Sequence, residues 1–292
     1  MPSPNELVYF IEVAETLNIS RAAERLGISQ PTLSLSLQKL ESTLGRQLFI
    51  RTKAGVQLTR AGTKLVSQAR NLIWEWDKIQ SDALKDESEI RGRYVLGCHP
   101  SVALYSLPRL FPKLLEAHPL LEIKLHHDLS RRITEDVISF KIDFGIVVNP
   151  WQHPDLIIKP LWKDEVSLWV SPRPSPLQDP KSGKAVLVCD PDLLQTQSIL
   201  KQLSKKGFTF QRTITSSSLE VIATIIESKG GVGVLPARVA TRLKERPLRR
   251  LPGNDQPKFQ DSIALVYRAD AQKSKASRAL AHFMERELRE LT

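Results

Sequence analysis

The spacing of the apolar residues changes near residue 92, and this change constrains the fold more than any other feature of the sequence. Before it, apolar side chains recur every three or four residues, which is typical of amphipathic helices. After it, apolar runs such as Tyr94–Gly97, Leu121–Leu125 and Phe144–Val148 alternate with helical segments, a pattern that predicts a mostly parallel sheet. We therefore expect an α+β chain with a helical N-terminal unit and a C-terminal α/β unit.

The first 45 residues predict a helix, a second helix and a tight turn into a third. The first helix is expected from Leu7 to near Asn18. Ser20 is expected to cap a short second helix that stops at Gly27, and Ser29 to cap a third that runs to about Leu44. Helix, turn and helix form the geometry that places a reading helix in the DNA major groove, although a purely structural helical corner is the alternative.

The segment after the third helix predicts a hairpin with a basic tip. Two short β-prone runs, 47–51 and 56–58, flank a turn that contains Lys53. Residues 18–70 hold nine Lys and Arg side chains against two acidic ones. This excess of positive charge suits contacts with DNA phosphates and makes the structural-corner alternative weak.

Six linked motifs in the first 62 residues resemble the N-terminal signature of the LysR-type regulators. They are Phe10–Glu15, Ser20–Leu26, Ile28–Ser34, Leu40–Gly45, Leu48–Arg51 and Leu58–Gly62. The resemblance implies a winged helix-turn-helix in a dimeric or tetrameric regulator that binds partly palindromic promoter DNA. It makes twelve residues candidates for DNA contact: Ser20, Arg21, Ser29, Gln30, Pro31, Thr32, Ser34, Leu35, Gln38, Lys39, Arg51 and Lys53. Leu35 departs from the family, in which this position is often basic or an amide.

A long linker helix is predicted to follow the DNA-binding unit. Its apolar residues fall at alternating intervals of four and three, as in a heptad seam: Leu65, Ala69, Leu72, Trp76 and Ile79. Pairing with a second copy of the helix would bury this stripe, so we expect these residues to form a dimer interface. Packing on the helix's own chain is the alternative, and Trp74, which lies off the seam, fits either.

The C-terminal 200 residues resemble the two-lobed, periplasmic-binding-protein-like effector domain of the same regulators. Short motifs carry the resemblance, among them Leu107-Pro108, His118-Pro119 and the run Gly231–Pro236. We expect units at 1–60, 61–91 and 92–292, with lobe I over 92–161 and 267–292 and lobe II over 162–266. The resemblance implies an effector between the lobes, at strand ends and helix N-termini. Candidate effector contacts are Cys98, His99, Ser101, Leu129, Ser130, Val148, Asn149, Cys189, Ser216 and Ser217. Helix capping is the alternative role of the serines.

The charge of the C-terminal unit bears on the effector. From Arg93 to the end there are 30 basic and 21 acidic residues. This excess favours a small anionic effector, with a solvated basic surface as the alternative. The expected partners are double-stranded promoter DNA, this effector, further copies of the chain as a homodimer or homotetramer, and RNA polymerase; no cofactor is expected.

Other classes of protein lack support in the sequence. It has no nucleophile elbow, no phosphate-cradling loop and no metal-ligand spacing, so we expect neither an enzyme nor a metal site, although His126-His127 beside Asp128 comes nearest to one. No run of apolar residues is long enough to cross a membrane and the start lacks an export signal, so we expect a cytoplasmic protein. A redox switch would require both Cys98 and Cys189 to line the cleft.

Overall fold

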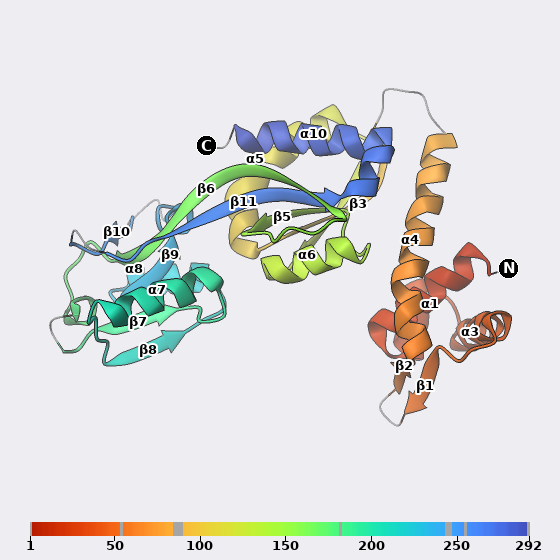
Figure 1. The fold of residues 1–292 in the computed structure, drawn as a ribbon, viewed down its shortest axis with the longest axis horizontal. Helices are drawn as coiled ribbons and strands as arrows, with labels where there is room; N and C mark the ends of the chain where they lie inside the picture. The colour runs from red at the N-terminus through yellow and green to blue at the C-terminus, as the bar shows by residue number, and fades with distance from the viewer. Residues whose placement is uncertain are drawn as a thin grey trace.

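Two structural units joined by one long helix make up the chain (Figure 1). The structure is a computed structural model that describes residues 2–52, 55–83, 90–180, 183–242, 247–253 and 256–290, without the side chains of residues 77–83. The N-terminal unit consists of α1 (Pro4–Thr16), α2 (Ile19–Leu26), α3 (Gln30–Leu44), β1 (Phe49–Thr52) and β2 (Gly55–Leu58). The connecting helix is α4 (Arg60–Ala83).

The first two helices begin at caps that differ from the prediction. Helix α1 starts three residues before Leu7, because Ser3 and Glu6 form a reciprocal capping box. The predicted cap at Ser20 is wrong. The side chain of Asn18 accepts the hydrogen bond from the backbone N–H of Arg21 at 3.0 Å, and Ser20 lies inside the first turn of α2. The capping pattern therefore predicted that both helices exist, but it gave the wrong cap residue for α2.

The predicted turn into α3 is confirmed. Gly27 has a left-handed backbone with φ of 67°, which suits glycine, and the hydroxyl of Ser29 accepts a hydrogen bond from the backbone N–H of Thr32. The inner face of α3 packs through Leu33, Leu37 and Leu40 into the core of the N-terminal unit. This packing leaves the opposite, polar face of α3 toward solvent.

The hairpin is anchored to α3 by one carboxylate. Glu41 accepts backbone hydrogen bonds from Leu48 at 2.6 Å and Phe49 at 3.1 Å, where the chain enters β1. The predicted hairpin is confirmed, since β1 and β2 pair in antiparallel register, with Phe49 opposite Leu58 at one end and Thr52 opposite Gly55 at the other.

Helix α4 begins directly after Thr59, whose hydroxyl accepts a hydrogen bond from the backbone N–H of Gly62. A Cβ atom at Gly62 would lie 2.2 Å from the carbonyl oxygen of Leu48, so this close approach of helix and hairpin requires glycine. The expectation for Ala69 is wrong: its side chain is buried in the core of its own N-terminal unit, because α4 packs along α1 there. The first half of α4 therefore belongs to the N-terminal unit.

The C-terminal unit is built on one mixed sheet with strand order β4-β3-β5-β11-β6-β9-β7-β8. One lobe contains β3 (Gly92–Cys98), β4 (Leu121–His127) and β5 (Phe144–Val148) with α5 (Pro100–Ala117), α6 (Ser130–Ile138) and α10 (Lys275–Arg289). The other contains β7 (Val186–Cys189), β8 (Arg212–Thr215), β9 (Val232–Pro236) and β10 (Arg249–Arg250) with α7 (Leu194–Lys205), α8 (Leu219–Glu227) and α9 (Ala237–Ala240). The two-lobed α/β architecture predicted from the sequence is confirmed.

Two long strands cross between the lobes, β6 (Leu156–Val170) and β11 (Phe259–Arg268). They pair in antiparallel register over their lengths, with a bulge between Ile263 and Ala264. Figure 1 shows both strands curving from one lobe to the other. The expected lobe boundaries, at residues 161 and 266, fall inside these strands.

Replacing Glu41 with Ala is expected to destabilise the N-terminal unit. Two backbone N–H groups at the start of the hairpin would lose their acceptor, at a cost of about 1–3 kcal/mol in the free energy of unfolding. Hydrogen exchange over residues 46–58 should become faster and the thermal midpoint of this unit should fall. Glu24→Ala, at an exposed position of α2, is the control; equal effects of the two substitutions would contradict the anchoring role of Glu41.

Candidate functional site

The polar face of α3 holds most of the residues expected to read DNA. Of the predicted residues on α3, those with exposed side chains are Gln30, Pro31, Thr32, Leu35, Gln38 and Lys39. The amide of Gln30 donates a hydrogen bond to the half-buried Ser34 hydroxyl at 2.9 Å, which orders one turn of the helix. Leu35 is 66% exposed, so packing against the described residues does not explain an apolar residue at this point. A solvent-facing leucine on a reading helix can contact a thymine methyl group.

The basic side chains around α3 divide into exposed and internally paired groups. Arg21 and Arg51 are exposed, at the start of α2 and on the hairpin, while Lys53 lies outside the described residues. Lys39 forms an ion pair of 2.7 Å with the buried carboxylate of Glu6. It thereby fixes α3 against α1, so DNA would compete with Glu6 for its charge.

Basic residues outside the predicted set divide in the same way. Arg70 is buried and its guanidinium lies 3.0 Å from Glu15, so this charge does not face DNA. Arg46, Arg60 and Lys64 are exposed near the hairpin and add to the positive surface.

The second half of α4 exposes apolar side chains. Leu72 is 58% exposed and Trp76 is 43% exposed, whereas Leu65 packs against the N-terminal core. The side chain of Ile79 lies outside the described part of the chain. Trp74 points elsewhere, with its ring centroid 6.0 Å from that of Phe140 in the C-terminal unit. Leu72 and Trp76 therefore remain as an uncovered stripe one helical turn apart.

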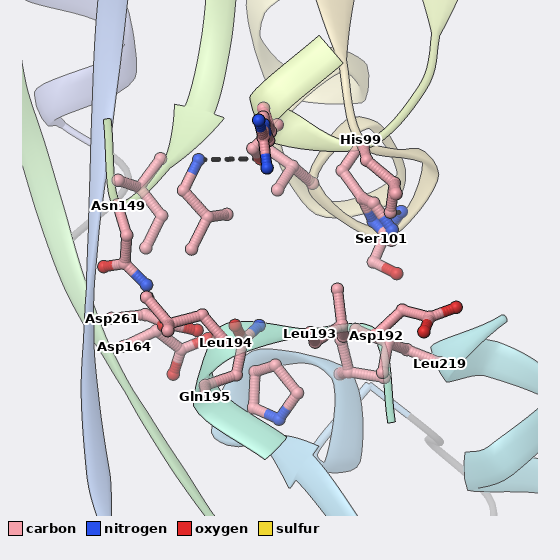
Figure 2. A pocket seen from close by; sticks show the side chains of 18 of the residues that line it. His99, Ser101, Asn149, Asp164, Asp192, Leu193, Leu194, Gln195, Leu219 and Asp261 are labelled. Atoms are coloured by element: carbon pink, nitrogen blue, oxygen red, sulfur yellow. Dashed lines mark hydrogen bonds between the residues drawn. The ribbon is translucent and has the colours of Figure 1, made fainter. Parts of the chain in front are cut away.

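A pocket of about 610 Å³ lies between the two lobes. Six predicted effector residues line it: His99, Ser101, Leu129, Ser130, Val148 and Asn149. The sequence did not predict the other lining residues. They come from α5 and α6, from the loop after β5, from β6 and β11, which we call the hinge strands, and from lobe II. Among them are Tyr105, Arg131, Thr134, Trp151, Asp164, Asp192, Leu193, Leu194, Gln195, Leu219 and Asp261. Figure 2 shows His99 and Ser101 on one side of the pocket and Asp192–Gln195 on the other.

Two of the predicted pocket residues at helix starts also serve their own lobe. His99 caps α5 by accepting a hydrogen bond from the Ser101 backbone N–H at 3.3 Å, and burial lowers the pKa of its imidazole. The Ser130 hydroxyl accepts from the backbone N–H of Val148 at 2.9 Å, which ties α6 to β5. Ser101 differs, because its buried hydroxyl oxygen has no partner among the described residues.

Four predicted effector residues do not line the pocket, which corrects the expectation for Cys98, Cys189, Ser216 and Ser217. Cys98 ends β3 and Cys189 ends β7, and both side chains are buried in the hydrophobic core. Burial raises the pKa of Cys98 to about 12 and that of Cys189 to about 11. The Ser216 hydroxyl serves the turn into α8, and Ser217 is exposed. The condition for a redox switch, two thiols facing the cleft, is not met.

The hinge strands place two carboxylates in the pocket. Asp164 on β6 and Asp261 on β11 are direct cross-strand partners, and both are buried. The side chain of Asn149 donates to Asp261 at 2.7 Å and accepts from the backbone N–H of Ser262 at 2.9 Å. Burial, and in second place the charge of Asp164, raises the pKa of Asp261 to about 7.

These charges do not support the predicted anionic effector. The pocket is lined by three aspartates, whereas its one arginine, Arg131, is paired with Glu135 at 3.1 Å and points to solvent. The basic excess of the C-terminal unit therefore lies mainly on its surface.

Comparison with known protein families identifies the chain. Residues 4–63 match the bacterial regulatory helix-turn-helix of the lysR family, and residues 87–289 match the LysR substrate binding domain. Together these two matches span most of the sequence. The chain belongs to the LysR family of bacterial transcription regulators, and it is not an enzyme.

Individual relatives support this membership. The chain is 30% identical over 277 residues to the hydrogen peroxide-inducible genes activator of Pectobacterium carotovorum, with 90% of this chain and 89% of that protein covered. A full-length OxyR variant from Pseudomonas aeruginosa has the same fold, with a TM-score of 0.70, 24% identity, and 99% of this chain and 98% of that chain covered. Full-length CbnR in complex with its target DNA gives a TM-score of 0.52 at 22% identity, with 98% and 99% covered. No helix among the described residues has the length and apolar character needed to span a membrane.

Replacing Asp261 with Asn should stabilise the protein in a pH-dependent way. The pKa of this carboxyl rises from 3.8 to about 7 on folding, so wild-type stability falls as the pH rises through that window. The variant avoids this loss and can still accept the hydrogen bond from Asn149. Its advantage should be small near pH 4 and grow to at most about 4 kcal/mol at pH 8.

Thermal unfolding from pH 4 to pH 8 checks this expectation. Glu116→Gln, at an exposed acid on α5, removes the same charge and should show no such trend. A difference between Asp261→Asn and wild type that stays constant with pH would contradict a buried, proton-binding carboxyl.

Proposed function

We propose that this LysR-family regulator binds its own promoter region as a homodimer and that a small effector in the interlobe pocket changes that binding. The uncovered polar face of α3, beside the exposed Arg21 and Arg51, is the observation that carries the DNA-binding half. Promoter DNA, reached in the cytoplasm, is the primary partner, and RNA polymerase is a further one. Two further copies, forming a tetramer, would extend the same assembly.

The dimer is proposed from the stripe on α4. Leu72 and Trp76 lie four residues apart and expose large apolar side chains that no described residue covers. A second copy of α4 would bury them and place two α3 helices on one DNA duplex, which matches a two-fold symmetric site. Ala69 takes no part, since its own chain buries it.

The effector is proposed to act by binding rather than by oxidising a thiol. The relative from Pectobacterium is named for its response to hydrogen peroxide. The two cysteines of this chain are buried and their pKa values are raised, so little reactive thiolate forms at neutral pH. The pocket, in contrast, is large enough for a small organic molecule and opens between lobes joined by two strands. Closure of the lobes around a bound effector would shift the population toward one arrangement of the dimer.

Fluorescence anisotropy with the DNA upstream of its own gene tests the regulator function. We expect a discrete fragment to bind at least about a thousandfold more tightly than unrelated DNA. Gln30→Ala should weaken specific binding by about 1–3 kcal/mol, because α3 would lose an amide that can read a base edge. Arg51→Ala should weaken binding to both DNAs and reduce the salt slope by about one.

Gln68→Ala, at an exposed amide on α4, is the matched control for Gln30→Ala. Equal affinity of wild type for upstream, neighbouring and unrelated fragments would contradict sequence-specific regulation. Equal losses from Gln30→Ala and Gln68→Ala would contradict the reading role of α3.

Sedimentation analysis tests the dimer. Leu72→Asp combined with Trp76→Ala should shift the protein toward the monomer by at least about tenfold in dissociation constant, because a charge would replace apolar contact at the seam. Leu120→Asp, at an exposed leucine in the turn before β4, should leave the association unchanged. A monomeric wild type, or unaltered association of the double variant, would exclude α4 as the dimer interface.

A further inference from the structure

The two aspartates of the pocket form an unusual pair. Asp164 and Asp261 stand directly opposite each other on neighbouring strands, a position in which like charges repel. Both are almost completely buried, at 6% and 2% exposed. Figure 2 shows the two side chains together at the hinge, on the wall of the pocket. A positive group in the pocket, placed between or beside the two carboxylates, would offset their mutual repulsion.

The surrounding groups compensate only one of these charges. Burial raises the pKa of Asp164. Arg238 on α9 offsets part of this effect, because its backbone N–H donates to Asp164 at 3.3 Å and its charged guanidinium, which lies over the rings of Tyr105 and Trp162, is near. Asp261 receives a hydrogen bond from the neutral amide of Asn149. Within the described ranges no cation forms an ion pair with Asp261.

Other charges facing the pocket do not fill this role. Asp192 adds a third carboxylate from lobe II. The pKa of His99 is lowered by burial, so its imidazole is neutral at pH 7, and Arg131 is paired with Glu135. The pocket thus has more negative charge than its own side chains balance.

An independent observation points to a ligand in the same pocket. Only 3% of Ser101 is exposed, yet its hydroxyl oxygen has no hydrogen-bond partner among the described residues. Figure 2 shows this hydroxyl directed into the pocket. Buried polar groups are almost always satisfied, and an orphan that faces a cavity is typical of a site that a ligand completes.

Part of the remaining lining is apolar and open. Leu129 and Trp151 from one lobe and Leu194 from the other are 41%, 38% and 61% exposed, although all three line the pocket. A ligand with an apolar body would cover these side chains as the lobes close, and the tryptophan face would also attract a cation.

We propose that the effector is an organic ammonium ion, in which a protonated amine binds the Asp164–Asp261 pair and an apolar body packs between Leu129, Trp151 and Leu194. This inference rests on the proposed effector function of the pocket and names the chemical class of the ligand. The ammonium group supplies the missing positive charge to Asp261, and a second polar group of the ligand, on the opposite side of the pocket, reaches the Ser101 hydroxyl.

Calorimetric titration of the full-length protein with three probes of similar shape tests the class. The probes are 2-phenylethylammonium, the neutral 2-phenylethanol and the anionic phenylacetate. We expect saturable binding of the ammonium probe with a Kd of about 1 mM or tighter, and binding of the other two at least about tenfold weaker. Asp261→Asn and Asp164→Asn should each weaken the ammonium probe by at least about tenfold, whereas Glu116→Gln should have no effect.

The pH dependence provides a readout that a purely structural role would not change. Affinity for the ammonium probe should rise from pH 6 to pH 8, because the carboxyl of Asp261, whose pKa is about 7, must lose its proton to bind a cation. In Asp261→Asn this rise should disappear.

Each other outcome overturns the proposal. Preferred binding of phenylacetate or 2-phenylethanol, or binding of none of the three, would exclude an ammonium ligand at the pair. Equal ammonium affinity in wild type and Asp261→Asn would do the same. Specific DNA binding is measured without any probe, so failure of the ligand class and failure of the regulator function are distinguished.

Discussion

The antiparallel ladder between β6 and β11 is the interaction on which the rest of the structure depends. It joins the strands of one lobe to those of the other, from Phe259 beside Val166 at one end to Arg268 beside Leu156 at the other. The pocket opens beside this ladder, and the carboxylates of Asp164 and Asp261 belong to its third residue pair from the Phe259 end. Any change in the angle between the lobes must bend these two strands, so a group bound at the carboxylate pair acts directly on the hinge.

The same hinge strand reaches the helix that carries the DNA-binding unit. Arg268 ends β11, and its guanidinium lies 3.9 Å from the ring centroid of Phe140. Phe140 in turn packs against Trp74 of α4. Arg268 is held in place by a bidentate interaction with Asp270 and by a hydrogen bond to the carbonyl oxygen of Ile138. Contacts therefore run without interruption from the pocket wall to the linker helix, which supplies a physical route for a lobe movement to alter the position of the DNA-binding unit.

The sequence predicted features that neighbouring residues determine and failed where distant contacts decide. Gly27 and Ser29 fixed the turn into α3 because capping is local, but Asn18 and Ser20 are both good caps, and only the end of α1 shows which one is used. The heptad spacing at Ala69 is compatible both with packing against a second copy of α4 and with packing into the chain's own core. Spacing alone does not distinguish these two arrangements. Cys98 and His99 are adjacent, yet the strand end directs one into the core and the other into the pocket. Asp164 and Asp261 are far apart in the sequence, and only the register of the hinge strands brings them together.

A reversible cross-link tests, without knowledge of the effector, whether the arrangement of the lobes controls DNA binding. Leu129→Cys and Leu194→Cys place thiols on exposed residues of opposite lobes at the pocket mouth, while the native Cys98 and Cys189 stay buried. The measurement is the affinity for the upstream DNA fragment in the oxidised and the reduced state, with mass spectrometry to verify the disulfide. Control of DNA binding by the lobes predicts that cross-linking changes this affinity by about fivefold or more and that reduction reverses the change. Equal affinity of the cross-linked and reduced protein would contradict it.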